Sequence, residues 1–303
     1  MNLVTVTCNR DFQHMLLQAE SIQKFLEPCT HWIVINEYEN LDVDRWHNAL
    51  SKFYINHKYK ILTPTDFEMK VLPVSGWHTQ QYFKLAISTF TKEDYIIMDT
   101  KGFFIKPTTL SYWKNTMGSG VLHKFRESIE IPSWKDNWED ISTYYAKKFN
   151  ATSLTYFLFC PGPFKIDIDI IKRYDMKNLL SDLYPTKEEE KSYFELTGNQ
   201  LYPSEFIFYS YLARDYFDKL APVKNSCLSI SPTHLSGKND TQILLEILQK
   251  MALADTNNNI TSFCIHPLIF NKVSDDHLNH INKWLTKKGF DFQFSPKLLT
   301  PEL

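Results

Sequence analysis

Two charged residues of opposite sign follow a short apolar run in the first third of the chain. Residues 95–98 (YIIM) are predicted to form a buried strand, and Asp99 and Lys101 come directly after it. A carboxylate at the mouth of a sheet suits a hard divalent cation, which prefers oxygen ligands. The ammonium of Lys101 cannot bind a metal, but it can neutralise a phosphate. A carboxylate that only caps a turn is the alternative for Asp99, and the sequence leaves it open.

Polar residues also stand at the ends of the other predicted strands. In an open parallel sheet, ligands bind outside the carboxyl ends of the strands. We therefore expect the polar groups at these ends to meet at one edge of the sheet. They are Thr7, Asn9 and Arg10 after strand 3–7, Asn36 and Glu37 at the end of strand 31–36, and His266 after the run 263–265. The alternative is that strand ends are polar only because turns are polar.

The segment from Gly76 to Leu85 is the most unusual stretch of the sequence. Gly76 can supply a turn, and a helix is predicted from about residue 78 to 90. Gln80 and Gln81 lie four and three residues before Lys84, so these side chains share one helix face. Two amides and an ammonium could hold a diphosphate or a ribose. An ordinary amphipathic helix with these groups toward solvent is the alternative.

The elements that must position these residues alternate between strands and helices in the first half. Strands are expected at 3–7, 31–36, 59–62, 95–98 and 103–105, and helices at 11–26, 41–54 and 78–90. This order predicts an α/β fold with a mostly parallel sheet and helices on both faces. The second half is less regular, with short strands at 120–125 and 263–267, a short apolar run at 155–160, and helices at 137–149, 164–180, 203–217 and 275–288. We expect one domain over residues 1–303, with an embellished C-terminal half.

The composition excludes several classes of function. The chain has 33 Lys and Arg against 35 Asp and Glu, so it lacks the basic excess typical of nucleic-acid-binding domains. Its 8 glycines form neither the Rossmann nor the P-loop phosphate motif. The 5 cysteines have no zinc-site spacing, which indicates reduced thiols and predicts a cytoplasmic protein. No apolar run reaches about 18 residues, so no transmembrane segment is expected.

Residues 76–107 (GWHTQQYFKLAISTFTKEDYIIMDTKGFFIKP) resemble the core of a glycosyltransferase-like family encoded with polysaccharide-synthesis genes. The resemblance covers about residues 1–110. The same segment is more distantly similar to glycogenin-like and other GT-A enzymes. The residues that carry it are Gly76, Trp77, Gln80, Gln81, Lys84, Leu85, Ala86, Asp99, Thr100, Lys101, Phe104 and Pro107.

The resemblance implies a GT-A fold and transfer of a sugar from a nucleoside diphosphate sugar to a glycan or other hydroxyl acceptor. Residues 1–110 would form the nucleotide-binding half and 111–303 the acceptor-side half. By position, Asp99 is the first carboxylate of a D-x-D motif that holds Mn²⁺ or Mg²⁺, His266 is a second metal ligand, and Glu205 is the general base. From their placement at strand ends and on the helix that leads into Asp99, we expect the donor-binding residues to be Thr7, Asn9, Arg10, Asn36, Gln81, Lys84, Asp99 and Lys101.

This chain departs from the D-x-D pattern at Lys101, where a second acidic residue is expected. We expect Asp99 to contact a divalent ion, with His266 nearby and Lys101 away from the metal, because one ammonium is a weak match for a diphosphate. The alternative is that Lys101 and Arg10 replace the metal. Other functions stay open: a catalytically inactive sugar- or nucleotide-binding relative, a nucleotidyltransferase, or a structural partner protein.

Overall fold

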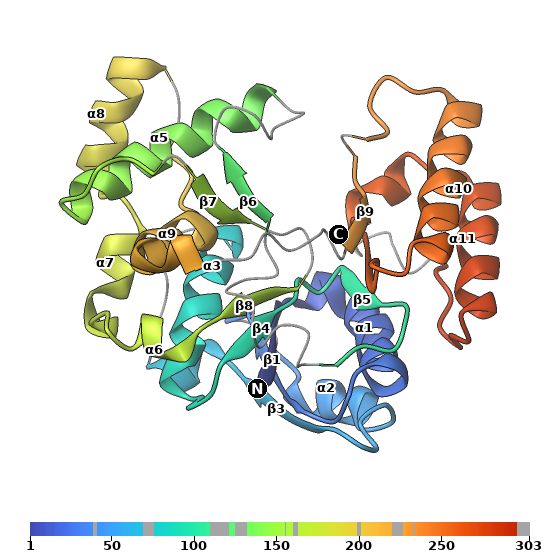
Figure 1. Ribbon diagram of the computed structural model, residues 1–303. Helices are drawn as coiled ribbons and strands as arrows, with labels where there is room; N and C mark the ends of the chain where they lie inside the picture. Colours follow the sequence, from blue (N-terminus) through green and yellow to red (C-terminus); the bar gives the residue numbers. More distant parts are fainter. Residues whose placement is uncertain are drawn as a thin grey trace.

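A twisted, mostly parallel sheet forms the centre of the computed structural model (Figure 1). The structure describes residues 1–38, 41–68, 76–109, 121–124, 132–154, 156–159, 163–198, 201–219, 227–232 and 234–295. Within these residues the central sheet has the strand order β3-β2-β1-β4-β8, with β8 antiparallel to β4 and the other pairs parallel. Its strands are β1 (Asn2–Thr7), β2 (Thr30–Ile35), β3 (Lys58–Leu62), β4 (Tyr95–Ile97) and β8 (Phe164–Ile166).

Alternate residues of the central strands enter two different cores, because successive side chains of a strand point to opposite faces. Val4 and Val6 of β1 pack with the helices on one face, whereas Leu3 packs with those on the other. The first face is covered by α3 (Gly76–Ala86), α5 (Pro132–Lys148) and α9 (Glu205–Ala213), and the second by α1 (Phe12–Phe25) and α2 (Val43–Leu50). The expected layering of helices on both faces is therefore confirmed.

A second, smaller sheet carries the C-terminal part of the chain. It has the order β5-β10-β9, in which β10 is antiparallel to β5 and parallel to β9. Its elements are β5 (Gly102–Phe104), β9 (Cys227–Ile230) and β10 (Ser262–Ile265), packed with α10 (Asp240–Thr256) and α11 (Asp275–Lys287). Because β5 begins three residues after Asp99, this sheet continues directly from the end of β4.

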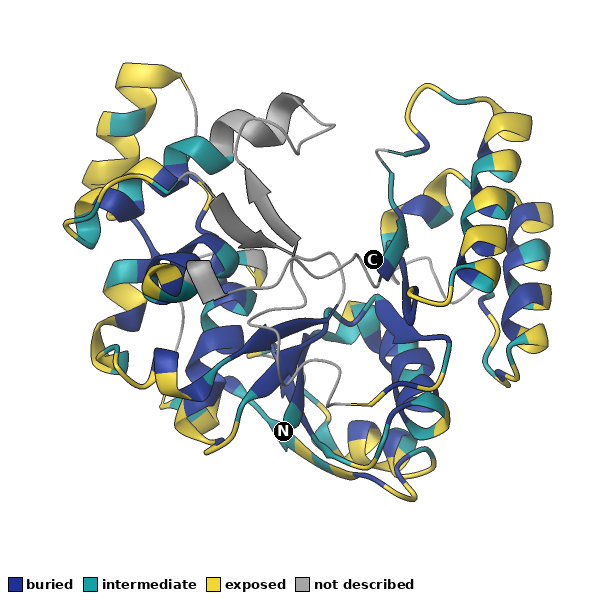
Figure 2. Ribbon diagram, in the orientation of Figure 1, coloured by how far each residue is buried: buried dark blue, intermediate teal, exposed yellow. Residues whose placement is uncertain are grey.

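The remaining elements surround the first face of the central sheet. They are the antiparallel pair β6 (Val121–Lys124) and β7 (Tyr156–Phe159), and the helices α6 (Ile168–Ile171), α7 (Leu179–Leu183) and α8 (Lys187–Thr197). Short 3₁₀ helices span Asn9–Asp11, Pro64–Phe67, Ile87–Thr89, Met176–Asn178, Arg214–Lys219 and Pro267–Asn271. Figure 2 shows the central strands buried, while α8 presents mostly exposed residues to solvent.

The prediction of one helix over residues 164–180 is wrong. Phe164–Ile166 form β8 at the edge of the central sheet, and the chain then makes α6, a 3₁₀ turn and α7. The sequence FKI can satisfy its backbone groups by pairing with β4, and Lys165 forms an ion pair with Asp94 at 3.0 Å. The helix α10 was not predicted at all. The division into halves at about residue 110 stays a prediction.

Candidate functional site

Polar residues predicted at the ends of β1, β2 and β4 gather at the carboxyl edge of the central sheet, whereas His266 follows β10 of the smaller sheet. β1 and β2 are parallel, with Thr7 paired to Ile35, so Asn9 and Asn36 follow at the same edge. β4 runs parallel to β1 on its other side, which brings Asp99 to this edge as well. The register of three strands therefore places residues together that lie up to 90 positions apart.

Lys84 of α3 is the centre of the charged groups at this edge. Its Nζ atom lies 2.8 Å from Asp99 Oδ1 and 2.8 Å from Glu205 Oε1. The side chains of Lys84 and Glu205 are only 4% and 3% exposed, whereas that of Asp99 is 32% exposed. Lys101 adds a longer ion pair, 3.5 Å from Nζ to Asp99 Oδ2. We call Lys84, Asp99, Lys101 and Glu205 the charge cluster.

The groups of this cluster shift one another's pKa values. Burial acts to raise the pKa of Asp99, but Lys84 and Lys101 hold it well below its usual range. Burial acts to lower the pKa of Lys84, and the Asp99 and Glu205 carboxylates raise it well above its usual value. For Glu205 burial prevails, and its pKa is raised although Lys84 opposes the shift. Lys84 and Asp99 thus favour each other's charged forms, whereas burial favours the neutral form of Glu205.

A chain of buried hydrogen bonds fixes the turn that carries Asp99 and Lys101. Gln18 of α1 donates from Nε2 to the carbonyls of Asp99 and Gly102, at 2.9 and 2.8 Å. Its Oε1 accepts from the Thr5 hydroxyl at 2.7 Å, and Thr5 Oγ1 lies 2.9 Å from His31 Nε2. Gly102 N–H closes the turn by donating to the Asp99 carbonyl at 2.8 Å. The backbone beneath the charge cluster is therefore tied to α1 and β1.

Sequence reasoning missed Gln18, although one signal was present. Gln18 lies three residues after Met15 and four before Ile22, so it falls within the apolar stripe of its helix. A fully buried amide in such a stripe needs hydrogen-bond partners, because an unsatisfied buried polar group is costly. The turn at the end of β4 supplies them.

Asn36 organises the start of α3. Its Nδ2 donates to the Gly76 carbonyl at 2.7 Å, and its Oδ1 accepts from the Thr79 hydroxyl at 2.8 Å. Asn9 has a comparable role beside it, because its Oδ1 accepts from the Trp46 indole at 3.2 Å and its N–H donates to Glu37. Both predicted donor residues lie at the edge, and their side chains are engaged with neighbouring elements.

The other predicted site residues differ widely in exposure. The side chain of Arg10 is 73% exposed, and its guanidinium lies 3.7 Å from Asp11. Thr7 and Gln81 are buried, and the hydroxyl of Thr7 has no hydrogen-bond partner among the described residues. His266 is half-buried, and its Nδ1 accepts from the N–H of Leu268 at 3.2 Å, which caps a 3₁₀ helix. Burial, reinforced by Lys101, lowers the pKa of His266 to about 4.

The residues around Asp99 do not fit the predicted Mn²⁺ or Mg²⁺ ion. One Asp99 oxygen pairs with Lys84 and the other with Lys101, so both face ammonium groups that repel a cation. His266 uses Nδ1 as a helix cap. Within the described part of the chain, no group of three or more His, Cys, Asp or Glu residues is arranged to hold a metal. The donor set that the D-x-D pattern would provide is not assembled here.

Glu205 does reach the charge cluster, but not as an exposed carboxylate. It occupies the first turn of α9, after Ser204, whose hydroxyl accepts from the N–H of Ile207 at 3.4 Å. Its Oε1 accepts a hydrogen bond from Lys84 within the protein interior. A general base must lie within hydrogen-bond reach of the proton that it takes. The base role stays a prediction, and the observed geometry favours a role in holding Lys84.

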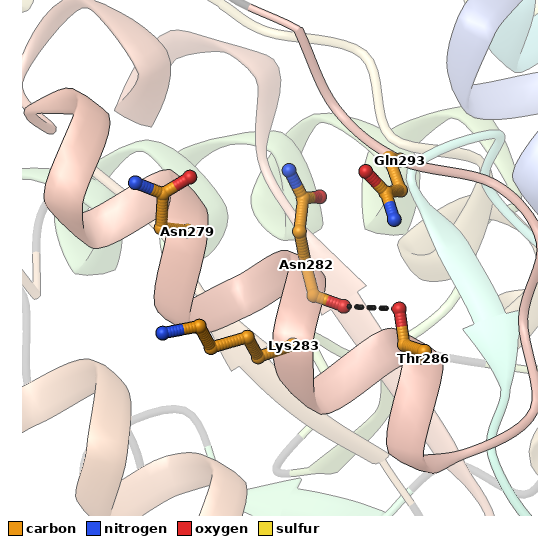
Figure 3. A pocket seen from close by; sticks show the side chains of 5 residues that line it. All are labelled: Asn279, Asn282, Lys283, Thr286 and Gln293. Atoms are coloured by element: carbon orange, nitrogen blue, oxygen red, sulfur yellow. Dashed lines mark hydrogen bonds between the residues drawn. The ribbon is translucent and has the colours of Figure 1, made fainter.

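A pocket elsewhere in the structure lies over α11 rather than at the strand ends. Figure 3 shows Asn279, Asn282, Lys283 and Thr286 along the helix and Gln293 on the segment after it. The side chain of Asn282 binds both the carbonyl and the N–H of Phe294, at 2.9 and 2.8 Å. This pocket follows from how α11 holds the next segment. Among the described helices, none is long and apolar enough to cross a membrane.

Comparison with known proteins identifies the fold. No family model and no curated protein matches the chain. The apo structure of mouse xyloside xylosyltransferase 1 is similar over 87% of this chain and 97% of its own, with 9% sequence identity and a TM-score of 0.50. A galactosyltransferase, LgtC, in complex with donor and acceptor sugar analogues covers 98% of both chains, with 11% identity and a TM-score of 0.47. The predicted GT-A-like α/β fold is confirmed, while identities this low show the fold alone.

Proposed function

We propose that this protein is a glycosyltransferase that moves a sugar from a nucleoside diphosphate sugar to a hydroxyl of a glycan or other acceptor. The observation that carries the proposal is the charge cluster at the carboxyl edge of β4. In an open α/β sheet this edge is where ligands bind. The fold, which is shared with a xylosyltransferase, supports the same conclusion by analogy.

The chemistry of transfer needs positive charge at this edge. The bond between the anomeric carbon and the β-phosphate oxygen breaks, and its electron pair stays on the phosphate. The acceptor oxygen bonds to the anomeric carbon, and its proton passes to solvent water. A positive group already positioned beside the β-phosphate stabilises the negative charge that develops there in the transition state, and it thereby lowers the barrier. Lys101, from the Asp99–Gly102 turn, is the proposed group, and the donor would extend along the edge past Asn36 and Asn9.

The test is release of nucleoside diphosphate from a panel of UDP- and GDP-sugars, with and without simple sugar acceptors. We expect turnover with at least one donor, and we expect Asp99→Asn to lower it because the charge cluster loses its central carboxylate. Asp44→Asn, an exposed residue in the first turn of α2, is the matched control. If no donor is turned over or bound, the proposed function is wrong.

A second candidate function is binding of a nucleotide sugar without transfer. It is favoured by Lys101, which stands where enzymes with a D-x-D motif carry a second acidic residue. A protein that has lost transfer could still bind a nucleotide sugar at this edge. Binding of the donor without release of nucleoside diphosphate, under every acceptor condition, would identify this inactive relative.

A further inference from the structure

We propose that Lys101 supplies the positive charge that binds the β-phosphate of the donor, so that nucleoside diphosphate binding to this protein needs no divalent cation. The proposal rests on the proposed function, and it replaces our expectation of a metal at Asp99. It follows from the difference between the two lysines of the charge cluster.

Lys84 already neutralises the carboxylates. Its ammonium lies at 2.8 Å from both Asp99 and Glu205, and its side chain is 4% exposed. Moving it toward a ligand would leave Glu205 buried without its partner, which is strongly unfavourable. Lys84 is therefore a fixed part of the site and cannot follow a phosphate.

Lys101 is held differently. Its ammonium lies 3.5 Å from Asp99, beyond the 2.7–2.9 Å typical of a charge-assisted hydrogen bond, and its side chain is 32% exposed. Because Lys84 satisfies Asp99 from the other side, Lys101 can turn toward a ligand without leaving that carboxylate unpaired. Burial acts to lower the pKa of Lys101, but Asp99 raises it above its usual value, so the ammonium stays charged.

The backbone of Lys101 is fixed even though its side chain is partly exposed. Its carbonyl accepts from the N–H of Ile265 at 3.1 Å, and Gln18 holds the turn from the other side. The fixed backbone therefore keeps Lys101 at the carboxyl edge beside Asp99. The side chain of Arg10, which follows the end of β1, is 73% exposed and lies 3.7 Å from Asp11.

The experiment is calorimetric titration of the full chain with UDP, GDP, CDP and ADP, in EDTA and then in Mn²⁺. We expect one of these to bind with similar affinity in both conditions. Lys101→Ala should weaken that diphosphate by roughly ten- to hundredfold, the loss expected for one hydrogen bond to a charged group. The same variant should bind the corresponding monophosphate as the wild type does, because the lost contact is to the β-phosphate.

Two variants control for indirect effects. Lys101→Arg keeps the positive charge and should retain most of the affinity. Lys52→Ala removes an exposed lysine beyond α2 and should bind as the wild type does. Melting temperatures of the variants without ligand show whether Lys101→Ala is folded. If Lys101→Ala is unfolded, the diphosphate affinity of Lys101→Arg is compared with that of the wild type instead.

The outcomes separate the two proposals. If EDTA abolishes diphosphate binding and Mn²⁺ restores it, while Lys101→Ala binds normally, the metal-free inference is overturned and the glycosyltransferase proposal stands. If no diphosphate binds in either condition and no donor is turned over, both are overturned.

Discussion

Lys84 and Glu205 form a buried ion pair at 2.8 Å although 121 residues separate them in the chain. Lys84 lies on α3 and Glu205 in the first turn of α9, so the pair joins two helices that cover the same face of the central sheet. The same ammonium holds Asp99 at the end of β4. One side chain thus fixes the two helices and the strand end relative to one another.

Removing the ammonium should cost more than an ordinary surface substitution. Lys84→Met should lower the free energy of unfolding by about 3–5 kcal/mol, because it leaves the buried carboxylate of Glu205 uncompensated. The double variant Lys84→Met with Glu205→Met should recover part of this loss. Chemical denaturation of the single and double variants measures the coupling.

The surface pair of Lys191 and Glu195 is the control for that cycle, since both side chains are more than 60% exposed. Lys191→Met should change the stability by less than about 1 kcal/mol. Equal effects of Lys84→Met and Lys191→Met would show that the buried pair is not a structural clamp.

Glu205→Gln tests whether this carboxylate is a base or a support. The amide oxygen of Gln can still accept from Lys84, so we expect a modest loss of stability and a fall in kcat well short of the roughly 10²–10⁴-fold expected for a lost general base. Turnover and melting temperature are measured on the same preparation. A full loss of that size at unchanged stability would establish Glu205 as the base.

Stability should fall as the pH drops below neutrality, partly because of His31. This histidine is fully buried between Tyr54 and Thr5, and burial lowers its pKa to about 3. Below pH 6.5 the unfolded chain therefore takes up a proton that the folded protein does not, so the folded state loses stability. The contribution is roughly 3 kcal/mol between pH 7 and pH 4.

Denaturation curves at several pH values check this, with His31→Gln compared with the wild type. The variant should be less stable at pH 7 but should show a shallower decline toward pH 4. His280→Gln, at a histidine whose side chain is 38% exposed, should leave the decline unchanged. A decline of the same slope in His31→Gln would contradict the assignment, and the remaining slope would belong to groups such as His14, whose pKa burial lowers to about 4.

Gln18 should matter for both stability and ligand binding. Gln18→Met keeps the size of the side chain but removes both donor bonds to the Asp99–Gly102 turn, which should cost about 1–3 kcal/mol. Because this turn carries Lys101, diphosphate affinity should fall as well. Gln249→Met, at an exposed position on α10, should change neither quantity. Normal affinity in Gln18→Met would show that the turn keeps its shape without the amide.

Much of the N-terminal half could be predicted from the sequence, because its information is local. The strands that end near Thr7, Asn36 and Asp99 are marked by apolar runs followed by turn residues, and the rule for parallel sheets predicts that their polar ends meet. The structure confirms that meeting, and it confirms that Lys84 and Asp99 share one edge.

Only the tertiary structure decided which side chains become the ion-pair and hydrogen-bond partners of these polar groups. Nothing in the sequence around Lys84 specifies that Glu205 will neutralise it, or that Gln18 will hold the turn before Lys101, because such contacts depend on how distant elements pack. Residues 164–166 form a strand for the same reason. Their backbone groups pair with the edge of β4, and local sequence propensity does not predict that pairing. The periodicity of the sequence determines which face of a helix or strand is buried. The packing of distant elements determines which charged side chains contact one another. In the charge cluster, those contacts decide whether the carboxylate of Asp99 is available to a metal or is already paired with lysine ammonium groups.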